Sequence, residues 1–191
     1  MSKIPLYVIA DCSGSMAEPG KSGMLSYLLS YVAECMRLGQ MPSWCAGVHA
    51  LSWAATVQPL PLGLLLTTGL AAPRPAGRAD LDVLMDVLER ELVGAGGAVR
   101  LLLMSDGGID HACQKRWQTW RARFALDIRA VALGADASRL ALEALAGKGA
   151  LYGAEEIGAA LHDWASPQAA PRSLAETVAA LVVDCAADDW Q

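Results

Sequence analysis

Residues 6–16 read Leu6-Tyr7-Val8-Ile9-Ala10-Asp11-Cys12-Ser13-Gly14-Ser15-Met16. The five apolar or aromatic residues at the start predict a buried strand, which ends abruptly in a carboxylate and two hydroxyls at alternating positions. Short side chains have little rotamer freedom, and Gly14 permits a tight turn, so Asp11, Ser13 and Ser15 can converge on one point. The stretch therefore predicts a cluster of hard oxygen ligands at the carboxyl end of a strand.

A second segment repeats this pattern. Residues 101–108 read Leu101-Leu102-Leu103-Met104-Ser105-Asp106-Gly107-Gly108, which is an apolar strand followed by a carboxylate and a glycine turn. Two parallel strands deliver the residues that follow them to the same edge of a sheet. We therefore expect Asp106 to join Asp11 in one site.

Composition limits the class of protein. With 191 residues, 54% of them hydrophobic and 18% charged, the chain can bury a sizeable core and is expected to form one domain. A net charge of -5 argues against a nucleic-acid or anionic-membrane surface. No signal peptide is recognised ahead of the first strand, so we expect a cytoplasmic protein. Five cysteines without a CxxC pair predict neither a disulfide framework nor a zinc site.

Strands alternate with helices along the whole sequence, which predicts an α/β fold: a doubly wound, mostly parallel sheet with helices on both faces. The domain is expected to span residues 1–165, and residues 166–191 a short linker and a helix at 174–187 that packs on the same domain. Apart from the first strand, the other predicted strands cover 46–53, 55–59, 99–105, 127–133 and 150–152. The predicted helices cover 23–38, 80–92, 112–124, 137–146 and 155–164, and the region 59–78 is expected to be mostly loop.

The two segments resemble the metal-ion-dependent adhesion site (MIDAS) of von Willebrand factor type A (vWA) domains, and the similarity covers nearly the whole chain. The resemblance implies a Rossmann-type sheet with the site above the carboxyl ends of its strands. It implies that Ser13 and Ser15 ligate Mg²⁺ directly, while Asp11 and Asp106 hold it directly or through water. A partner's carboxylate would complete the octahedron. Magnesium favours oxygen ligands, and Mn²⁺ or Ca²⁺ are the alternative cations.

One element of the vWA pattern is missing from the sequence. The family has a threonine on the loop before the second helix, whereas this chain has Arg78 or Ala79 there. Asp80 could compensate as an oxygen donor, or Thr67 and Thr68 could fold back from the long loop. Arg78 could instead place its own positive charge where the metal would sit.

Several polar residues also have plain structural interpretations. An Asp-x-Ser-x-Ser segment can be a simple turn in which Ser15 caps a helix. Asp110 is expected to cap a helix rather than to bind metal, and Trp117 and Trp120 to lie in the core. Polar or core roles are expected for the three histidines, which show no ligand spacing: His49, His111 and His162.

The favoured function is a non-enzymatic, metal-dependent protein-protein interaction module. The short form and the opening Ile4-Pro5-Leu6-Tyr7 are similar to bacterial intracellular vWA proteins of the TerY type, associated with tellurite resistance and stress, in which such domains accompany kinases and phosphatases. One alternative is a scaffold with a degenerate, metal-free site that uses Arg78 or the loop at 59–78 for contacts. A Mg²⁺-dependent phosphohydrolase is disfavoured, because Ser13 stands where such enzymes carry a second aspartate and no phosphate-binding loop is present.

Overall fold

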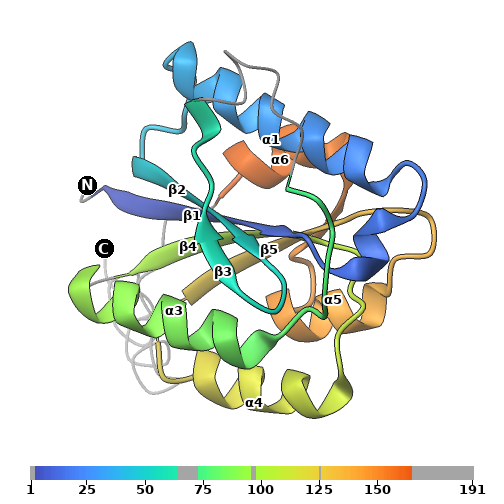
Figure 1. Cartoon of the computed structure of the whole chain (residues 1–191). Helices are drawn as coiled ribbons and strands as arrows, with labels where there is room; N and C mark the ends of the chain where they lie inside the picture. The colour runs from blue at the N-terminus through green and yellow to red at the C-terminus, as the bar shows by residue number, and fades with distance from the viewer. Residues whose placement is uncertain (1–2, 64–72, 96–97, 125, 165–191) are drawn as a thin grey trace, which may run out of the picture.

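The computed structural model describes residues 3–63, 73–95, 98–124 and 126–164. Within this part of the chain the strands form one sheet in the order β3-β2-β1-β4-β5-β6 (Figure 1). Every neighbouring pair is parallel except β2 and β3, which form an antiparallel hairpin. The predicted doubly wound, mostly parallel sheet is therefore confirmed. The strands are β1 (Ile4–Asp11), β2 (Cys45–Trp53), β3 (Val57–Pro59), β4 (Val99–Ser105), β5 (Leu126–Ala132) and β6 (Leu151–Gly153).

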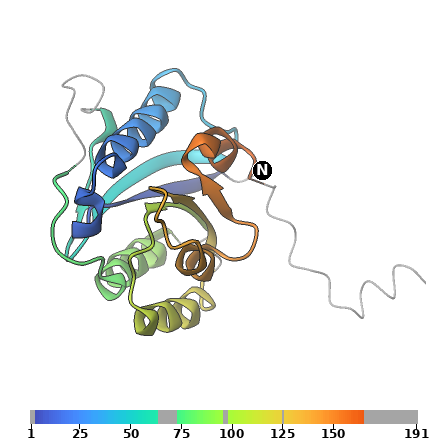
Figure 2. The same cartoon turned by 90° about the vertical axis from the view of Figure 1, so that its right-hand side faces the viewer.

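Helices cover both faces of the sheet, α1 and α6 on one side and α3, α4 and α5 on the other (Figures 1 and 2). None of the described helices is long and apolar enough to cross a membrane. The helices are α1 (Lys21–Arg37), α3 (Leu81–Ala95), α4 (His111–Arg121), α5 (Arg139–Ala146) and α6 (Ile157–His162), and two 3₁₀ turns are η1 (Gly14–Ala17) and η2 (Ala154–Glu156).

Two predicted helices are shorter than the apolar spacing indicates. The helix predicted over 112–124 ends at Arg121, whose carbonyl accepts a hydrogen bond from the Phe124 amide in a tight turn (3.1 Å). The helix predicted over 155–164 begins as η2, because the Glu156 carboxylate accepts a bond from the Gly153 amide (2.7 Å) and holds the chain in a turn. The predicted helix at 174–187, together with Thr67 and Thr68, lies outside the described residues.

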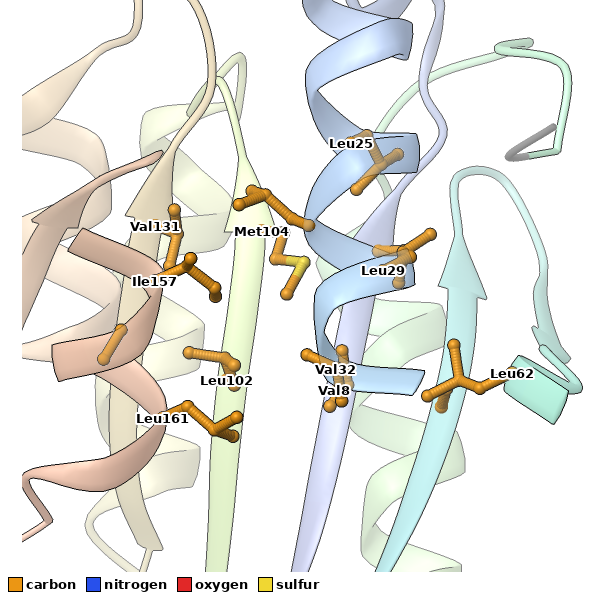
Figure 3. Packing of buried hydrophobic residues seen from close by; sticks show 14 of the residues in the cluster. Val8, Leu25, Leu29, Val32, Leu62, Leu102, Met104, Val131, Ile157 and Leu161 are labelled. Carbon is orange, nitrogen blue, oxygen red and sulfur yellow. The ribbon is translucent and has the colours of Figure 1, made fainter. Parts of the chain in front are cut away.

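The core lies in two layers because side chains alternate across each strand. On β1, Leu6, Val8 and Ala10 face α1 and α6, whereas Tyr7 and Ile9 face α3, α4 and α5. Figure 3 shows the first layer, in which side chains of α1, α6 and the sheet interdigitate. The residues labelled there are Val8, Leu25, Leu29, Val32, Leu62, Leu102, Met104, Val131, Ile157 and Leu161.

The buried Arg129 interrupts the apolar pattern at the edge of this first layer. The Arg129 guanidinium donates to the carbonyls of Ala159, Ala160 and Asp163 at the end of α6, at 2.8 to 3.1 Å. It also lies 4.3 Å from the ring centre of Trp164, a cation-π distance. These contacts close the otherwise open carbonyls of α6 and fasten this short helix to the sheet.

The strand order creates a switch point between β1 and β4. From β1 the chain winds outward through α1 to β2 and β3, then returns through α3 to β4 on the other side of β1. In open α/β sheets ligands bind at the carboxyl edge where the order reverses. Asp11 ends β1 and Ser105 ends β4, so the two predicted segments flank this crevice.

Two of the three leucines of α5 test the packing on the second face. Leu142 is fully buried and Leu140 is 82% exposed, although both lie on the same helix. We expect Leu142→Ala to lower the free energy of unfolding by about 2–5 kcal/mol through lost burial and the cavity left behind. Leu140→Ala should change it by less than about 0.5 kcal/mol. Urea unfolding followed by circular dichroism measures both, and equal effects would contradict the assigned packing.

Candidate metal centre

Asp11 is held rigidly at the end of β1. One carboxylate oxygen, Oδ1, accepts a hydrogen bond from the Ser13 amide (2.8 Å), and the other, Oδ2, accepts one from the Ser105 hydroxyl (2.5 Å). The side chain is fully buried. Burial raises the pKa of Asp11, the hydrogen bonds from Ser105 and Ser13 lower it in part, and the charge of Asp106 raises it further. The net shift is upward, so keeping this group ionised without a counter-ion is unfavourable.

The two serine hydroxyls of the first loop lie beside each other. Ser13 Oγ and Ser15 Oγ are 3.1 Å apart, which is hydrogen-bond distance. Two adjacent oxygens of a Mg²⁺ octahedron, each about 2.0–2.1 Å from the ion, stand about 3 Å apart. The pair therefore matches two neighbouring metal ligands as well as it matches a hydrogen-bonded pair.

Asp106 faces the same point from the end of β4. Its Oδ1 accepts from the Gly108 amide (3.0 Å), and its main-chain carbonyl accepts from the Ser138 amide (2.7 Å). A Cβ on Gly108 would lie 3.2 Å from Asp106 Oδ1 and 3.3 Å from Ser15 Oγ, so glycine leaves the space between these two oxygens open. The structure thus brings the four sequence-predicted ligands, Asp11, Ser13, Ser15 and Asp106, to one edge of the sheet.

Sequence reasoning missed a lysine at this edge. Lys21 is 3% exposed, and its Nζ lies 3.0 Å from Asp106 Oδ2, 2.6 Å from Asp136 Oδ2 and 2.8 Å from Glu18 Oε2. Burial alone would lower the pKa of Lys21, but hydrogen bonds to Asp136, Glu18 and Asp106 outweigh it and raise the pKa. A signal was available: a lysine at the first residue of a helix opposes the helix dipole unless acids surround it.

The loop before α3 approaches the site through its backbone. The Gly14 amide donates to the Gly77 carbonyl, and the Ala76 amide donates to the Cys12 carbonyl, both at 2.8 Å. A cavity of about 200 Å³ lies between the two loops. Its lining residues are Ser13, Gly14, Ser15, Gly77, Arg78, Ala79, Gly108 and Asp110.

The residues at the threonine position behave differently from one another. Ala79 is buried and supplies no oxygen, whereas Arg78 is 81% exposed and its guanidinium lies 3.7 Å from Asp110 Oδ2. Asp80 does not compensate through Oδ1, which accepts from the amide of Asp82 (2.9 Å) at the start of α3. Asp110 caps α4 by accepting from the Ala112 amide (2.8 Å), as predicted. Arg78 thus stands at the mouth of the cavity, paired across it with Asp110.

Other chemistry is poorly supported at this site. Burial raises the pKa of Cys12 to about 11, assisted by the charge of Asp11, so this thiol stays protonated at neutral pH. No group of three or more His, Cys, Asp and Glu residues suited to a metal ion occurs within the described ranges, so a cation here would depend on the serine hydroxyls. Trp117 and Trp120 lie in the core, as predicted.

A larger hollow of about 830 Å³ lies between α3 and α4, away from the serine hydroxyls. Ion pairs border it: Arg116 with Asp82 at 2.5 Å and Arg123 with Glu89 at 3.2 Å. Its lining contains none of the four predicted ligands. We therefore place the functional site at the switch point rather than in this larger hollow.

No known protein family matches the sequence, and no curated protein resembles it. Solved structures do resemble the fold. Manganese-loaded TRAP protein of Plasmodium vivax superposes with a TM-score of 0.65 at 13% identity, over 83% of this chain and 71% of that one. Mussel byssus proximal thread matrix protein 1 with a zinc-occupied MIDAS motif gives 0.59 at 17% identity, over 84% of this chain and 46% of that one.

The fold is that of a vWA domain. An aerotolerance-related membrane protein of Bacteroides fragilis has the same vWA fold, with a TM-score of 0.61 at 10% identity over 84% of this chain and all of that one. The chain spans only about half the length of the mussel protein. At these identities the likeness establishes the fold alone, and the function of this chain has to be argued from its own site.

The raised pKa of Asp11 predicts a pH dependence of stability. Between the unfolded pKa near about 4 and the higher native pKa, the folded protein binds more protons than the unfolded chain, so the contribution of Asp11 to stability falls as pH rises. Asp11→Asn removes this titration and keeps an acceptor for the Ser13 amide. In EDTA we expect the stability of Asp11→Asn relative to wild type to grow as pH rises through this window and then to level off.

Urea unfolding at a series of pH values measures this difference. Glu34 provides the control, because its hydrogen bond to Arg37 lowers its pKa, so the stability of Glu34→Gln relative to wild type should change in the opposite sense with pH. A difference between Asp11→Asn and wild type that does not vary with pH would show that Asp11 titrates normally.

Proposed function

We propose that this vWA domain is a non-enzymatic interaction module that holds a divalent cation and binds an acidic group of a protein partner through it. The single observation that carries the proposal is the pair of serine hydroxyls, 3.1 Å apart. They lie at the edge of the sheet where β1 ends in Asp11 and where Asp106 follows β4. Hard oxygen donors in this arrangement suit Mg²⁺ first, and Mn²⁺ or Ca²⁺ next. The manganese-loaded and zinc-occupied neighbours support a divalent cation in general terms.

The protein's own donors prepare the site for a cation. Ser13 and Ser15 would hold the ion through their hydroxyl oxygens, and Asp11 and Asp106 would hold it directly or through water. Backbone amides and Ser105 already fix both carboxylates, so little side-chain freedom is lost on binding. The bound ion would supply positive charge and an open coordination position for a carboxylate oxygen.

The surroundings support recognition rather than catalysis. The cavity at the site is lined by serine, glycine and alanine residues together with Arg78 and Asp110, which pair with each other. The thiol of Cys12 stays protonated, and both oxygens of Asp11 accept hydrogen bonds from the protein. A general base for hydrolysis would need a free, suitably placed acceptor. We therefore assign the domain a binding role, and propose no reaction.

The resemblance to TerY-type proteins suggests the setting. We propose a cytoplasmic role in a bacterial stress or signalling assembly, with a kinase, phosphatase or other stress protein as the source of the carboxylate. The support is the sequence that opens β1, Ile4-Pro5-Leu6-Tyr7. Nucleic acid and membrane surfaces are not proposed as partners, because the chain carries a net charge of -5.

A metal-free scaffold is the second candidate, and the threonine position favours it. Ala79 supplies no oxygen there, and Arg78 already places a cation at the mouth of the cavity. In this version Arg78 would bind the acidic partner in place of a metal ion. Partner binding would then be insensitive to chelator and to the loss of Asp11.

Metal titration distinguishes the two candidates. We expect wild type to bind Mn²⁺ and Mg²⁺ by titration calorimetry, and Asp11→Ala and Ser15→Ala to lose affinity by more than about 100-fold, since even residues behind the ligands cost 10–100-fold. Ser30→Ala on the exposed face of α1 is the matched control and should bind normally. Circular dichroism verifies that each variant is folded. Absence of binding both in folded wild type and in a folded variant without the positive charge of Lys21 would favour the metal-free scaffold.

A partner assay tests the interaction itself. A partner captured with Mn²⁺ should be released by EDTA and should not bind Asp11→Ala, because the metal supplies the contact to its acidic group. Arg78→Gln separates the alternatives, since only the metal-free scaffold needs this guanidinium. Binding that survives EDTA but is lost in Arg78→Gln would overturn the metal-dependent function.

A further inference from the structure

We infer that Lys21 is an internal counter-ion that competes with the divalent cation for Asp106 and so weakens metal binding at this site. The inference rests on the proposed function and deepens it. It concerns the regulation of the cation affinity by a residue that ligates nothing itself.

The two oxygens of the Asp106 carboxylate have different neighbours. Oδ1 lies on the side of Ser15, since both atoms are within 3.3 Å of the point where a Cβ on Gly108 would stand. Oδ2 lies on the opposite side, 3.0 Å from Lys21 Nζ. A cation bound at the serines would therefore share this carboxylate with the ammonium group, and two cations on one buried acid repel each other.

The surrounding structure is built around the lysine. Gly134 adopts a φ of +91° beside the Lys21 stem, and a Cβ there would lie only 2.7 Å from Lys21 Cε. Asp136, in the same loop, accepts a hydrogen bond from Nζ at 2.6 Å. The loop after β5 thus leaves room for an ammonium group next to Asp106 and supplies an acid that retains it.

Asp106 is also held by groups other than Lys21. The Gly108 amide holds Oδ1, and the Ser138 amide holds the main-chain carbonyl, independently of the lysine. Besides its hydrogen bond to Oδ2, Lys21 contributes a positive charge at this point. Glu18 and Asp136 offset that charge only partly toward the site, because they are 56% and 58% exposed and water screens them.

The consequence for function is that the cation affinity of the site depends on its partner. With Lys21 present, Asp106 is neutralised before any cation arrives, so the cation gains less from this carboxylate. An incoming acidic group of the partner adds the missing negative charge. Cation and partner should then bind together more strongly than either binds alone.

Titration of Mn²⁺ alone tests the inference. We expect Lys21→Met to bind Mn²⁺ at least about tenfold more tightly than wild type, because a positive charge next to the ion has been removed. Lys21→Gln, which keeps a hydrogen-bond donor without the charge, should behave alike, and Lys21→Arg should restore weak binding. Lys115→Gln on α4 controls for the loss of one positive charge far from the site.

The outcomes separate the inference from the proposed function. Binding by wild type with equal or weaker binding by the neutral Lys21 variants overturns the inference alone. Binding by Lys21→Met but not by wild type supports it, whereas absence of binding in every folded variant removes the metal-dependent function itself. Thermal unfolding, in EDTA and with excess Mn²⁺, supplies the second readout, which is whether each variant is folded. If both neutral variants are unfolded even with excess Mn²⁺, Lys21 is a structural residue and the inference is wrong.

Discussion

The parallel pairing of β1 with β4 is the constraint on which the rest of the site depends. The register sets Ala10 opposite Met104, so that the next residues, Asp11 and Ser105, end their strands at the same level and form a 2.5 Å hydrogen bond. Because the strand order reverses between these two strands, the helices that follow them, α1 and α4, lie on opposite faces of the sheet (Figure 1). A one-residue shift in this register would turn Asp11 to the other face of the sheet and separate the two acids.

The buried charges at this edge of the sheet are stabilised by other protein groups rather than by solvent. Asp11, Asp106 and Lys21 are all nearly inaccessible to water, and burying a charge is unfavourable unless it is paired or hydrogen-bonded. Asp106 has an ammonium group, whereas Asp11 has only hydrogen-bond donors and an upward-shifted pKa. Asp11, which accepts a hydrogen bond from the Ser13 amide, is therefore the one of these two acids without a charged partner in the described part of the chain.

The loop before α3 reaches the site although it lacks the expected threonine. Two backbone hydrogen bonds, from Gly14 to Gly77 and from Ala76 to Cys12, bring the loop before α3 against the site without any side-chain oxygen. The same loop places Arg78 at the cavity, opposite Asp110. Proteins only 10–17% identical to this chain share its fold. A shared fold therefore need not imply shared ligand chemistry, because the backbone contacts of this loop do not depend on its side chains.

The sequence by itself determined the elements and the most local part of the site. Apolar periodicity located the strands, and the Asp11-to-Ser15 spacing brings its oxygens together within one turn, because both are properties of neighbouring residues. Tertiary structure alone decided which distant groups complete the site. Lys21 reaches Asp106 and Asp136 across 85 and 115 residues of sequence, and such contacts depend on strand order and loop conformation. The early end of the helix predicted at 112–124 and the late start of the one predicted at 155–164 have the same origin, since hydrogen bonds in turns outweighed the apolar spacing.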